Sequence, residues 1–341
     1  MSVVLLTDYA WPDTTIERDI IESAGFQFVA GPARAMPPED IEALVAQNDP
    51  AAIMTCWAEV TAAAISSCSK LAIIARMGVG LDNIDRAAAA AANAVVTNVP
   101  DYCVEEVSDH AVGLLLCWAR GIHTLDNESK AGRWNADTAH LVRVRDLTIG
   151  IVGFGRMGRR TAAKLRPFGV RMLVCSEPPL GEIDADIDIV DLTTLVSQSD
   201  VIILHLPLTP KTRDLFGESL FAKTKPGALL INVSRGGLID NKALLDALDR
   251  GHLGGAALDV VDGEPHPPQA VIGHPKVIAT PHVAFSSGAS IIELRRRAAE
   301  EVVRVLRGEP AHYPSPLPAS GVQGRSSIVD SKITRFRRNI L

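Results

Sequence analysis

Short apolar runs alternate with segments of helical periodicity along the first hundred residues. The runs SVVLL, FQFVA, AAIMT, LAIIA and AVVTN have the length and composition of strands. The intervening segments TIERDIIESA, PEDIEALVAQ, TAAAISSC and IDRAAAAAA are typical of helices. Strands that are apolar throughout and alternate with helices predict a parallel sheet that is covered on both faces.

A second set of alternating elements follows a long stretch rich in leucine and alanine. That stretch, from Val104 to about Ala131, predicts one helix. The alternation restarts at LTIGIVGFG and continues with predicted strands at RMLVC, DVIIL, GALLIN, GGAALDV and KVIAT. The last predicted helix covers residues 290–306. We therefore expect two α/β units, which agrees with a length of 341 residues, too long for one ordinary core.

Composition and charge exclude several classes of protein. Hydrophobic residues make up 47% and charged residues 22% of the chain, which is typical of a globular protein. The net charge is −6 and the body has no long basic run, so we expect no nucleic-acid partner. No apolar stretch has the length of a membrane span, and the start MSVVLLTDYA predicts a strand rather than a signal peptide.

The cysteines and the tail complete this picture. The five cysteines are scattered without a C-x-x-C pair, and no histidine cluster has metal-ligand spacing. We expect a cytoplasmic protein with reduced thiols and no metal centre. Residues 313–341 are rich in proline and serine and end in the basic stretch SKITRFRRNIL, which predicts an extended or disordered tail.

A glycine pattern lies between a predicted strand and a predicted helix in LTIGIVGFGRMGRR. Gly153 permits a tight turn, Gly155 lets the backbone approach a pyrophosphate, and Gly158 lets the helix pack on its strand. Arg156 and Met157 begin the helix, whose N-terminus attracts an anion. In this context the pattern predicts a dinucleotide site, although a glycine-rich turn without a ligand is the alternative.

The residues after the next strand bear on which dinucleotide binds. A carboxylate about 20 residues beyond the glycines favours NAD, because it bonds the ribose hydroxyls and repels the extra phosphate of NADP. Here Ser176 occupies the strand end and Glu177 follows it. Serine would tolerate that phosphate, and Arg156 or Arg159 are possible partners for it. We expect NAD (NADH), with NADP as the less favoured cofactor.

Three further segments place chemically active residues just after strands. INVSRGGLID carries Arg235, ALDVVDGEP carries Asp259 and Glu264, and TPH carries His282. Ligands bind outside the carboxyl ends of the strands in an open α/β sheet. A cation, a carboxylate and an imidazole at one such edge suit the reduction of a carbonyl by hydride. Taken singly, these residues could instead be a surface ion pair, a loop carboxylate and a structural histidine, and the other histidines have no comparable setting.

These segments together resemble the D-isomer-specific 2-hydroxyacid dehydrogenases. The resemblance rests on RMGVGLDNID, the glycine loop, LHLPLTPKT, NVSRGGLID, LDVVDGEP and TPH, in the family's order, and reaches to about Pro310. It implies two doubly wound parallel-sheet domains of the α/β class. A Rossmann NAD-binding domain, residues 103–285, would be inserted into a flavodoxin-like substrate-binding domain, residues 1–102 and 286–312. Because relatives usually form dimers through the cofactor domain, it also implies a homodimer.

The resemblance implies a role for each site residue. His282 would be the general acid/base at the keto oxygen, Glu264 would support it, and Arg235 would bind and polarise the 2-oxo acid. The backbone amides of Val79 and Gly80 would hold the substrate carboxylate. Asp259 would orient the nicotinamide carboxamide. The other implied cofactor contacts are Pro207, Thr212, Val233 and Ser234.

Two stretches look most like the branch of the family that contains the C-terminal-binding proteins, which are NAD(H)-sensing corepressors. These stretches are NVPDYCVEEVSDHAVGLLL and TPHVAFSSGASIIELRRRAAEEVVRVLRGE. A binding protein is therefore the alternative to an enzyme, because corepressors keep the catalytic residues. Phe285 stands where they carry a tryptophan, and the tail is short, which favours an enzyme that interconverts a 2-oxo acid and a D-2-hydroxy acid. The aromatic residues that could shape its pocket are Trp11, Trp57, Tyr102, Trp134 and Phe285, and they leave the identity of the acid open.

Overall fold

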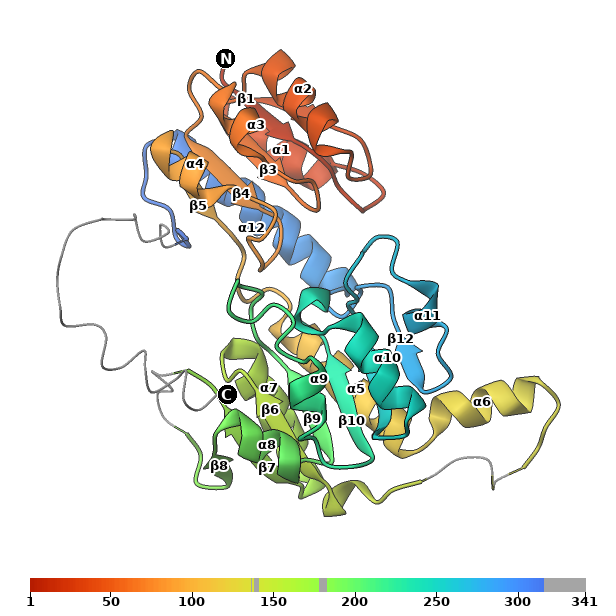
Figure 1. Cartoon of the computed structure of the whole chain (residues 1–341). Helices are drawn as coiled ribbons and strands as arrows, with labels where there is room; N and C mark the ends of the chain where they lie inside the picture. The colour runs from red at the N-terminus through yellow and green to blue at the C-terminus, as the bar shows by residue number, and fades with distance from the viewer. Residues whose placement is uncertain (136, 138–140, 178–182, 316–341) are drawn as a thin grey trace. The chain divides into compact units, whose positions relative to one another are not determined.

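The computed structural model describes residues 1–135, 137, 141–177 and 183–315, which form two compact units (Figure 1). The first unit consists of Met1–Cys103 and residues 287–315, and the second of Val104–Ser286. Each unit contains one sheet in which every strand pairing is parallel. The predicted α/β fold class is therefore confirmed. Of the predicted tail, residues 316–341 lie outside the described residues.

The sheet of the first unit has five strands in the order β2-β1-β3-β4-β5. This is the flavodoxin-like order, with a switch point between β1 and β3. All five strands coincide with predicted apolar runs: β1 (Val3–Leu6), β2 (Gln27–Ala30), β3 (Ala52–Thr55), β4 (Ile73–Arg76) and β5 (Val95–Thr97).

Within the described residues, the helices of the first unit are α1 (Thr15–Ser23), α2 (Pro38–Asn48), α3 (Ala62–Ser66), α4 (Arg86–Ala91) and α12 (Gly288–Leu306). Helices α2, α3 and α4 bury Ile41, Ile65 and Ala89 in one core with Leu5 and Ile53 of the sheet. Helix α12 comes from the other end of the chain and packs against β3, β4 and α1.

A buried ion pair joins α12 to α1. The Arg295 guanidinium donates through Nε to Glu17 Oε1 at 2.9 Å and through Nη2 to Glu17 Oε2 at 2.8 Å. Both side chains are almost completely buried. Paired, two-point bonds of this kind have a defined geometry, and losing either partner would leave an uncompensated buried charge. The pair therefore fixes how the last helix sits on the first.

The residues after α12 return to the same sheet. The buried carboxylate of Glu301 accepts hydrogen bonds from the backbone N–H of His312 at 2.6 Å and of Tyr313 at 3.2 Å. Ser315 N then donates to Val96 O at 2.7 Å, and Pro314 pairs with Thr97 in an antiparallel bridge. This segment covers the backbone edge of β5, which would otherwise be exposed.

The sheet of the second unit has seven strands in the order β12-β11-β10-β9-β6-β7-β8. This is the Rossmann order with one additional strand at β12. The strands are β6 (Thr148–Val152), β7 (Arg171–Cys175), β8 (Ile187–Ile189), β9 (Val201–Leu204), β10 (Ala228–Asn232), β11 (Leu253–Leu258) and β12 (Val277–Ala279). Strand β8 was not predicted from the sequence, because it has only three residues and two of them are exposed.

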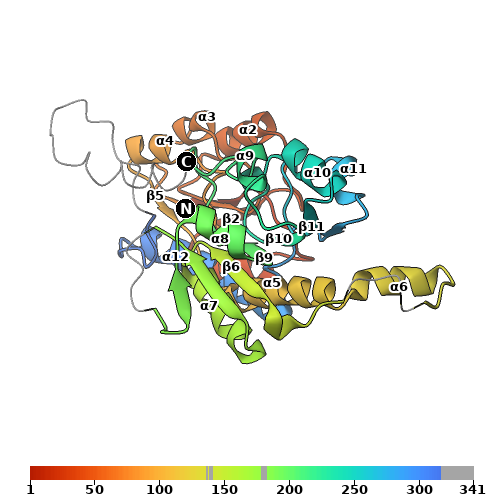
Figure 2. The same ribbon diagram turned by 60° about the horizontal axis from the view of Figure 1, so that its bottom comes forward.

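The α-helices of this unit are α5 (Val104–Ala119), α6 (Ile122–Lys130), α7 (Arg156–Leu165), α8 (Leu192–Gln198), α9 (Glu218–Phe221), α10 (Asn241–Asp249) and α11 (Gln269–Ile272). The single predicted helix from Val104 to Ala131 is wrong. It breaks at Gly121, whose φ of 60° is left-handed and ends α5. Helix α6 then leaves the sheet of its own unit and buries no residue (Figures 1 and 2).

None of the helices in the described part of the chain is both long enough and apolar enough to cross a membrane.

Candidate active site

Five segments that carry predicted site residues of the second unit each follow a strand of its sheet. The glycine loop follows β6, Ser176 follows β7, Arg235 follows β10, Asp259 follows β11 and His282 follows β12. Because these strands are parallel, their carboxyl ends lie at one edge of the sheet. The structure therefore places all five segments on the same side of this unit.

Glu264 and His282 form a hydrogen-bonded pair. His282 Nδ1 lies 2.7 Å from Glu264 Oε2, and Glu264 Oε1 accepts from the backbone N–H of Val261 at 2.8 Å. An ionised carboxylate can only accept, so Nδ1 carries the hydrogen in this pair. Both oxygens of Glu264 are thus engaged, and the imidazole is held in one orientation with Nε2 on its other side.

The backbone of His282 has an unusual conformation. Its φ is 53°, in the left-handed region that non-glycine residues rarely adopt, at a cost on the order of 1 kcal/mol. The N–H of His282 donates to Asp259 O at 2.8 Å. The ring of Phe285 lies edge-on to the imidazole, with the ring centroids 6.1 Å apart.

Asp259 holds the turn that contains His282. Its carboxylate is buried and accepts from Thr280 Oγ1 at 2.6 Å, from Val283 N at 2.9 Å and from Ala284 N at 2.9 Å. The predicted role of Asp259 is to orient the nicotinamide carboxamide. In the structure, both of its oxygens accept hydrogen bonds from the loop of His282, so Asp259 also positions that loop.

His110 is a member of this network that sequence analysis missed. His110 Nε2 lies 3.0 Å from Thr280 Oγ1 and 3.6 Å from Asp259 Oδ1. Since the Thr280 hydroxyl donates to Asp259, it accepts from His110. The residue lies in α5, 149 positions before Asp259 in the chain, and no local pattern indicated the contact.

Arg235 stands on a turn with defined side-chain bonds. The Asn232 amide donates to Arg235 O at 2.9 Å and accepts from Ser234 N at 3.0 Å, while Ser234 Oγ donates to Leu204 O at 2.7 Å. The half-buried guanidinium of Arg235 donates to Ser234 O at 2.7 Å. The turn that sequence analysis proposed as the substrate-binding segment is therefore rigid.

Gly236 brings the Arg235 turn against the loop of Glu264. A Cβ at Gly236 would lie 2.1 Å from the carbonyl carbon of Val261 and 2.2 Å from Asp262 N. Val261 is the residue whose N–H binds Glu264. The segments of Arg235 and of the Glu264–His282 pair are thus packed backbone to backbone, which only glycine permits.

The glycine loop has the geometry that its sequence predicted. Gly153 has φ 95°, and a Cβ there would lie 2.5 Å from His205 O; a Cβ at Gly158 would lie 2.2 Å from Gly153 O. A Cβ at Gly155, by contrast, would meet nothing within 4 Å. Helix α7 begins at Arg156, followed by Met157, so its N-terminal amides lie beside open space. This arrangement fits a pyrophosphate.

Ser176 and Glu177 differ in their surroundings. Ser176 Oγ accepts a hydrogen bond from Phe154 N in the glycine loop at 3.1 Å, whereas Glu177 is exposed. Of the two arginines considered for NADP, Arg156 is exposed and Arg159 has its guanidinium carbon 4.7 Å from the Phe154 ring centroid. Because Ser176 accepts the hydrogen bond from Phe154 N, it stabilises the glycine loop.

His205 contacts the glycine loop and the helix that follows it. Burial lowers the pKa of His205 to about 4, so the ring is neutral at pH 7. Its Nε2 lies 3.0 Å from Thr161 Oγ1 of α7, and its carbonyl is the group against which Gly153 packs.

The remaining predicted cofactor contacts belong to two turns. Thr212 Oγ1 donates to Pro207 O at 2.7 Å and accepts from Thr209 N at 2.8 Å, which closes the turn after β9. Val233 is buried and Ser234 is half-buried on the turn after β10.

Val79 and Gly80 follow β4 in the first unit. The Asn98 amide donates to Val79 O at 2.6 Å, and Val79 itself is exposed. Within the described residues, the backbone N–H groups of Val79 and Gly80 have no hydrogen-bond acceptor. Two adjacent N–H donors in this state suit a carboxylate.

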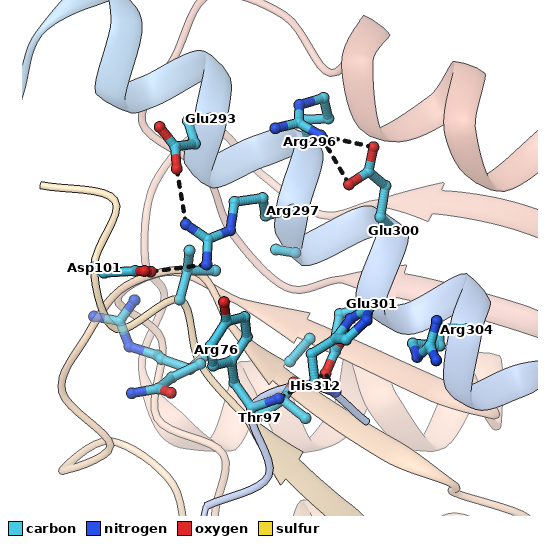
Figure 3. A pocket seen from close by; sticks show the side chains of 15 residues that line it. Arg76, Thr97, Asp101, Glu293, Arg296, Arg297, Glu300, Glu301, Arg304 and His312 are labelled. Carbon is cyan, nitrogen blue, oxygen red and sulfur yellow. Dashed lines mark hydrogen bonds and ion pairs between the residues drawn. The ribbon is translucent and has the colours of Figure 1, made fainter. Parts of the chain in front are cut away.

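A polar pocket of about 510 Å³ lies between α12 and the ends of β4 and β5 in the first unit (Figure 3). Arg297 points between Asp101 and Glu293, at 2.7 Å from each, and Arg296 pairs with Glu300 at 3.0 Å. These cations are balanced by carboxylates of the same chain, so the pocket is not a ready site for an anion.

Burial keeps two of the cysteines in the thiol form. Burial raises the pKa of the Cys56 thiol to about 12 and that of Cys175 to about 11, so both stay protonated at neutral pH. No group of three His, Cys, Asp or Glu side chains that could hold a metal occurs in the part of the chain that the structure describes.

Comparison with known proteins agrees with this geometry. Residues 112–284 match the model of the NAD-binding domain of D-isomer specific 2-hydroxyacid dehydrogenases. A D-3-phosphoglycerate dehydrogenase from Mycobacterium tuberculosis is 34% identical over 310 residues, which cover 90% of this chain and 56% of that protein. The chain thus spans little more than half the length of this relative.

Two solved structures extend the likeness to nearly the whole chain. A glyoxylate reductase from Paecilomyes thermophila is 26% identical, with a TM-score of 0.82 and coverage of 92% of this chain and 98% of that one. An NADPH-dependent glyoxylate/hydroxypyruvate reductase from Sinorhizobium meliloti, solved with NADP and malonate, is 28% identical, with a TM-score of 0.81 and coverage of 96% and 99%.

The fold and the sequence match therefore define an α/β protein with an NAD-binding Rossmann unit. The chain belongs to the D-isomer specific 2-hydroxyacid dehydrogenase family.

The backbone contact at Gly236 makes a prediction about stability. Gly236→Ala would force Val261 and Asp262 apart, and overpacking of this kind costs about 1–3 kcal/mol. Urea unfolding should show a loss in the free energy of unfolding of that order. The matched control is Gly113→Ala on the exposed face of α5, where a Cβ meets nothing within 4 Å and helix propensity should raise stability by up to about 1 kcal/mol. Equal stability of the two variants would contradict the close packing.

Proposed function

We propose that the protein is an NAD-dependent D-2-hydroxyacid dehydrogenase that interconverts a 2-oxo acid and a D-2-hydroxy acid. The observation that carries the proposal is the Glu264–His282 pair, held at 2.7 Å beside the Arg235 turn at the carboxyl edge of a Rossmann sheet. Family membership supports the reaction class.

Each site residue has a separate proposed role in the reduction of the carbonyl group. Bound NADH supplies the hydride, and the open space at Gly155 together with the N-terminus of α7 suits its pyrophosphate. His282 gives a proton from Nε2 to the keto oxygen, while Glu264 stabilises the ring that carries it. Arg235 binds and polarises the 2-oxo acid through charge-assisted bonds. The amides of Val79 and Gly80 donate to the substrate carboxylate.

The corepressor alternative uses the same residues, so kinetics must separate the two functions. Phe285 beside His282, in place of the corepressors' tryptophan, favours the enzyme. The measurement is NADH oxidation at 340 nm with a panel of 2-oxo acids, and no turnover with any member would favour the binding protein.

We also propose a homodimer that is formed through α6. This helix buries no residue within its own chain, and large apolar side chains are exposed at both ends of its segment, Ile122 at 55% and Trp134 at 92%. Such side chains on a projecting element are typical of a protein interface.

Replacing His282 tests its catalytic role. His282→Gln removes the proton donor, so kcat should fall by a factor on the order of 10² to 10⁴, whereas the Kd for NADH, measured by fluorescence, should stay near the wild-type value. Near-normal turnover of the variant would rule out His282 as the acid/base.

Cofactor preference tests the roles of Ser176 and Glu177. Because Ser176 is bonded to Phe154 N and leaves Glu177 as the nearby carboxylate, we expect kcat/KM to be higher with NADH than with NADPH, by less than in a relative with Asp at the strand end. Glu177→Ala should reduce the preference and Ser176→Asp should increase it. A clear preference for NADPH would point instead to Arg156 or Arg159.

Sedimentation velocity tests the dimer. The wild type should sediment at about twice the chain mass of 36.4 kDa. Ile122→Glu would bury a charge in the interface, so this variant should sediment closer to the mass of the monomer. Thr124→Glu on the same helix is the control and should remain a dimer. A monomeric wild type at micromolar concentration would refute the proposal.

A further inference from the structure

Trp57 stands at the carboxyl edge of the first sheet in an unusually well-defined turn. Its backbone N–H donates to Asp8 Oδ2 at 2.6 Å, and the preceding N–H of Cys56 donates to Asp8 Oδ1 at 3.0 Å. Asp8 follows β1, is completely buried and also accepts from Thr7 Oγ1 at 2.9 Å. A buried carboxylate with this many donors holds the turn in one geometry. The backbone that carries the Trp57 side chain is therefore fixed.

The guanidinium of Arg76 lies against the indole. Arg76 ends β4 and pairs in register with Thr55 of β3, and its guanidinium carbon is 5.8 Å from the Trp57 ring centroid. It donates to Asn83 Oδ1 at 3.1 Å and to the carbonyl of Met77. A cation beneath an indole attracts the ring and limits its rotation.

The same guanidinium touches the turn that leads to Val79 and Gly80. A Cβ at Gly78 would lie 2.5 Å from Arg76 Nη1, so the two groups are already in contact. Arg76 therefore contacts both the indole and the turn that leads to the proposed carboxylate-binding amides. Trp57 is 37% exposed, whereas Trp11 and Tyr102 are buried, with only 8% of each residue exposed.

We propose that Trp57 is a specificity-determining residue that contacts the side chain of the 2-oxo acid whose carboxylate is bound by Val79 and Gly80. This inference rests on the proposed function. An exposed indole that shares the Arg76 guanidinium with the turn of the carboxylate donors offers apolar area, and it favours a substrate with a branched alkyl or aromatic side chain. Arg76 is only 8% exposed, and its Nε and Nη1 already donate to Asn83 and Met77, so burial and these bonds disfavour a two-point grip on a substrate phosphate.

Glyoxylate provides the matched comparison, because it has no side chain that could reach Trp57. We expect the wild type to reduce phenylpyruvate and 4-methyl-2-oxopentanoate with higher kcat/KM than glyoxylate or 3-phosphohydroxypyruvate. Trp57→Ala should lower kcat/KM for the two apolar acids by a factor on the order of 10 or more and change that for glyoxylate less than threefold. Trp57→Phe should keep most of the activity towards the apolar acids.

The controls separate specificity from folding and from the proposed function. Phe168→Ala removes an aromatic side chain of the same exposure from the second unit and should change none of these values. An equal loss with all acids in Trp57→Ala, or a wild type that prefers the phosphorylated acid, would overturn the inference and leave the dehydrogenase intact. A wild type that reduces none of the four acids would overturn both.

Discussion

The buried carboxylate of Asp259 is the group on which the geometry of the site depends. The left-handed conformation of His282 is costly for a residue with a side chain, and a loop would not keep it without specific bonds. Asp259 provides them through both of its oxygens, and its own carbonyl accepts the N–H of His282. Without this carboxylate, the distance between Nδ1 and Glu264 would no longer be fixed by the fold.

Close backbone contacts between loops complete the arrangement. Gly236 packs on Val261 and Gly153 packs on His205, so direct backbone contact places each loop in addition to its side-chain hydrogen bonds. A glycine residue loses more conformational entropy on folding than any other residue, which lowers stability. Glycine is nevertheless required at these positions, because loops that follow neighbouring strands come into backbone contact at one edge of the sheet. The side chains of His282, Glu264 and Arg235 therefore extend from backbone segments whose positions are restricted by close packing.

The sequence allowed most of the fold and part of the site to be predicted, for identifiable reasons. Buried parallel strands are apolar throughout, so eleven of the twelve strands in the described part of the chain were visible as runs, whereas β8, with only one buried residue, was not. The Glu264–His282 pair followed from strand ends and family motifs. His110 and Asp8 did not, because their partners lie 149 and 48 positions away and depend on helix and strand placement. The five candidate aromatic residues could be sorted only by burial, which no local pattern encodes.

The two units use the same device at corresponding places. In each sheet an aspartate just after a strand, Asp8 after β1 and Asp259 after β11, is buried and accepts two backbone N–H groups from a turn after another strand. Burying a carboxylate costs free energy that an apolar residue would not, so such a group is retained where position matters more than stability. The turn held by Asp259 carries His282, the proposed acid. By the same reasoning, the turn held by Asp8 presents a side chain whose position matters, and that side chain is Trp57.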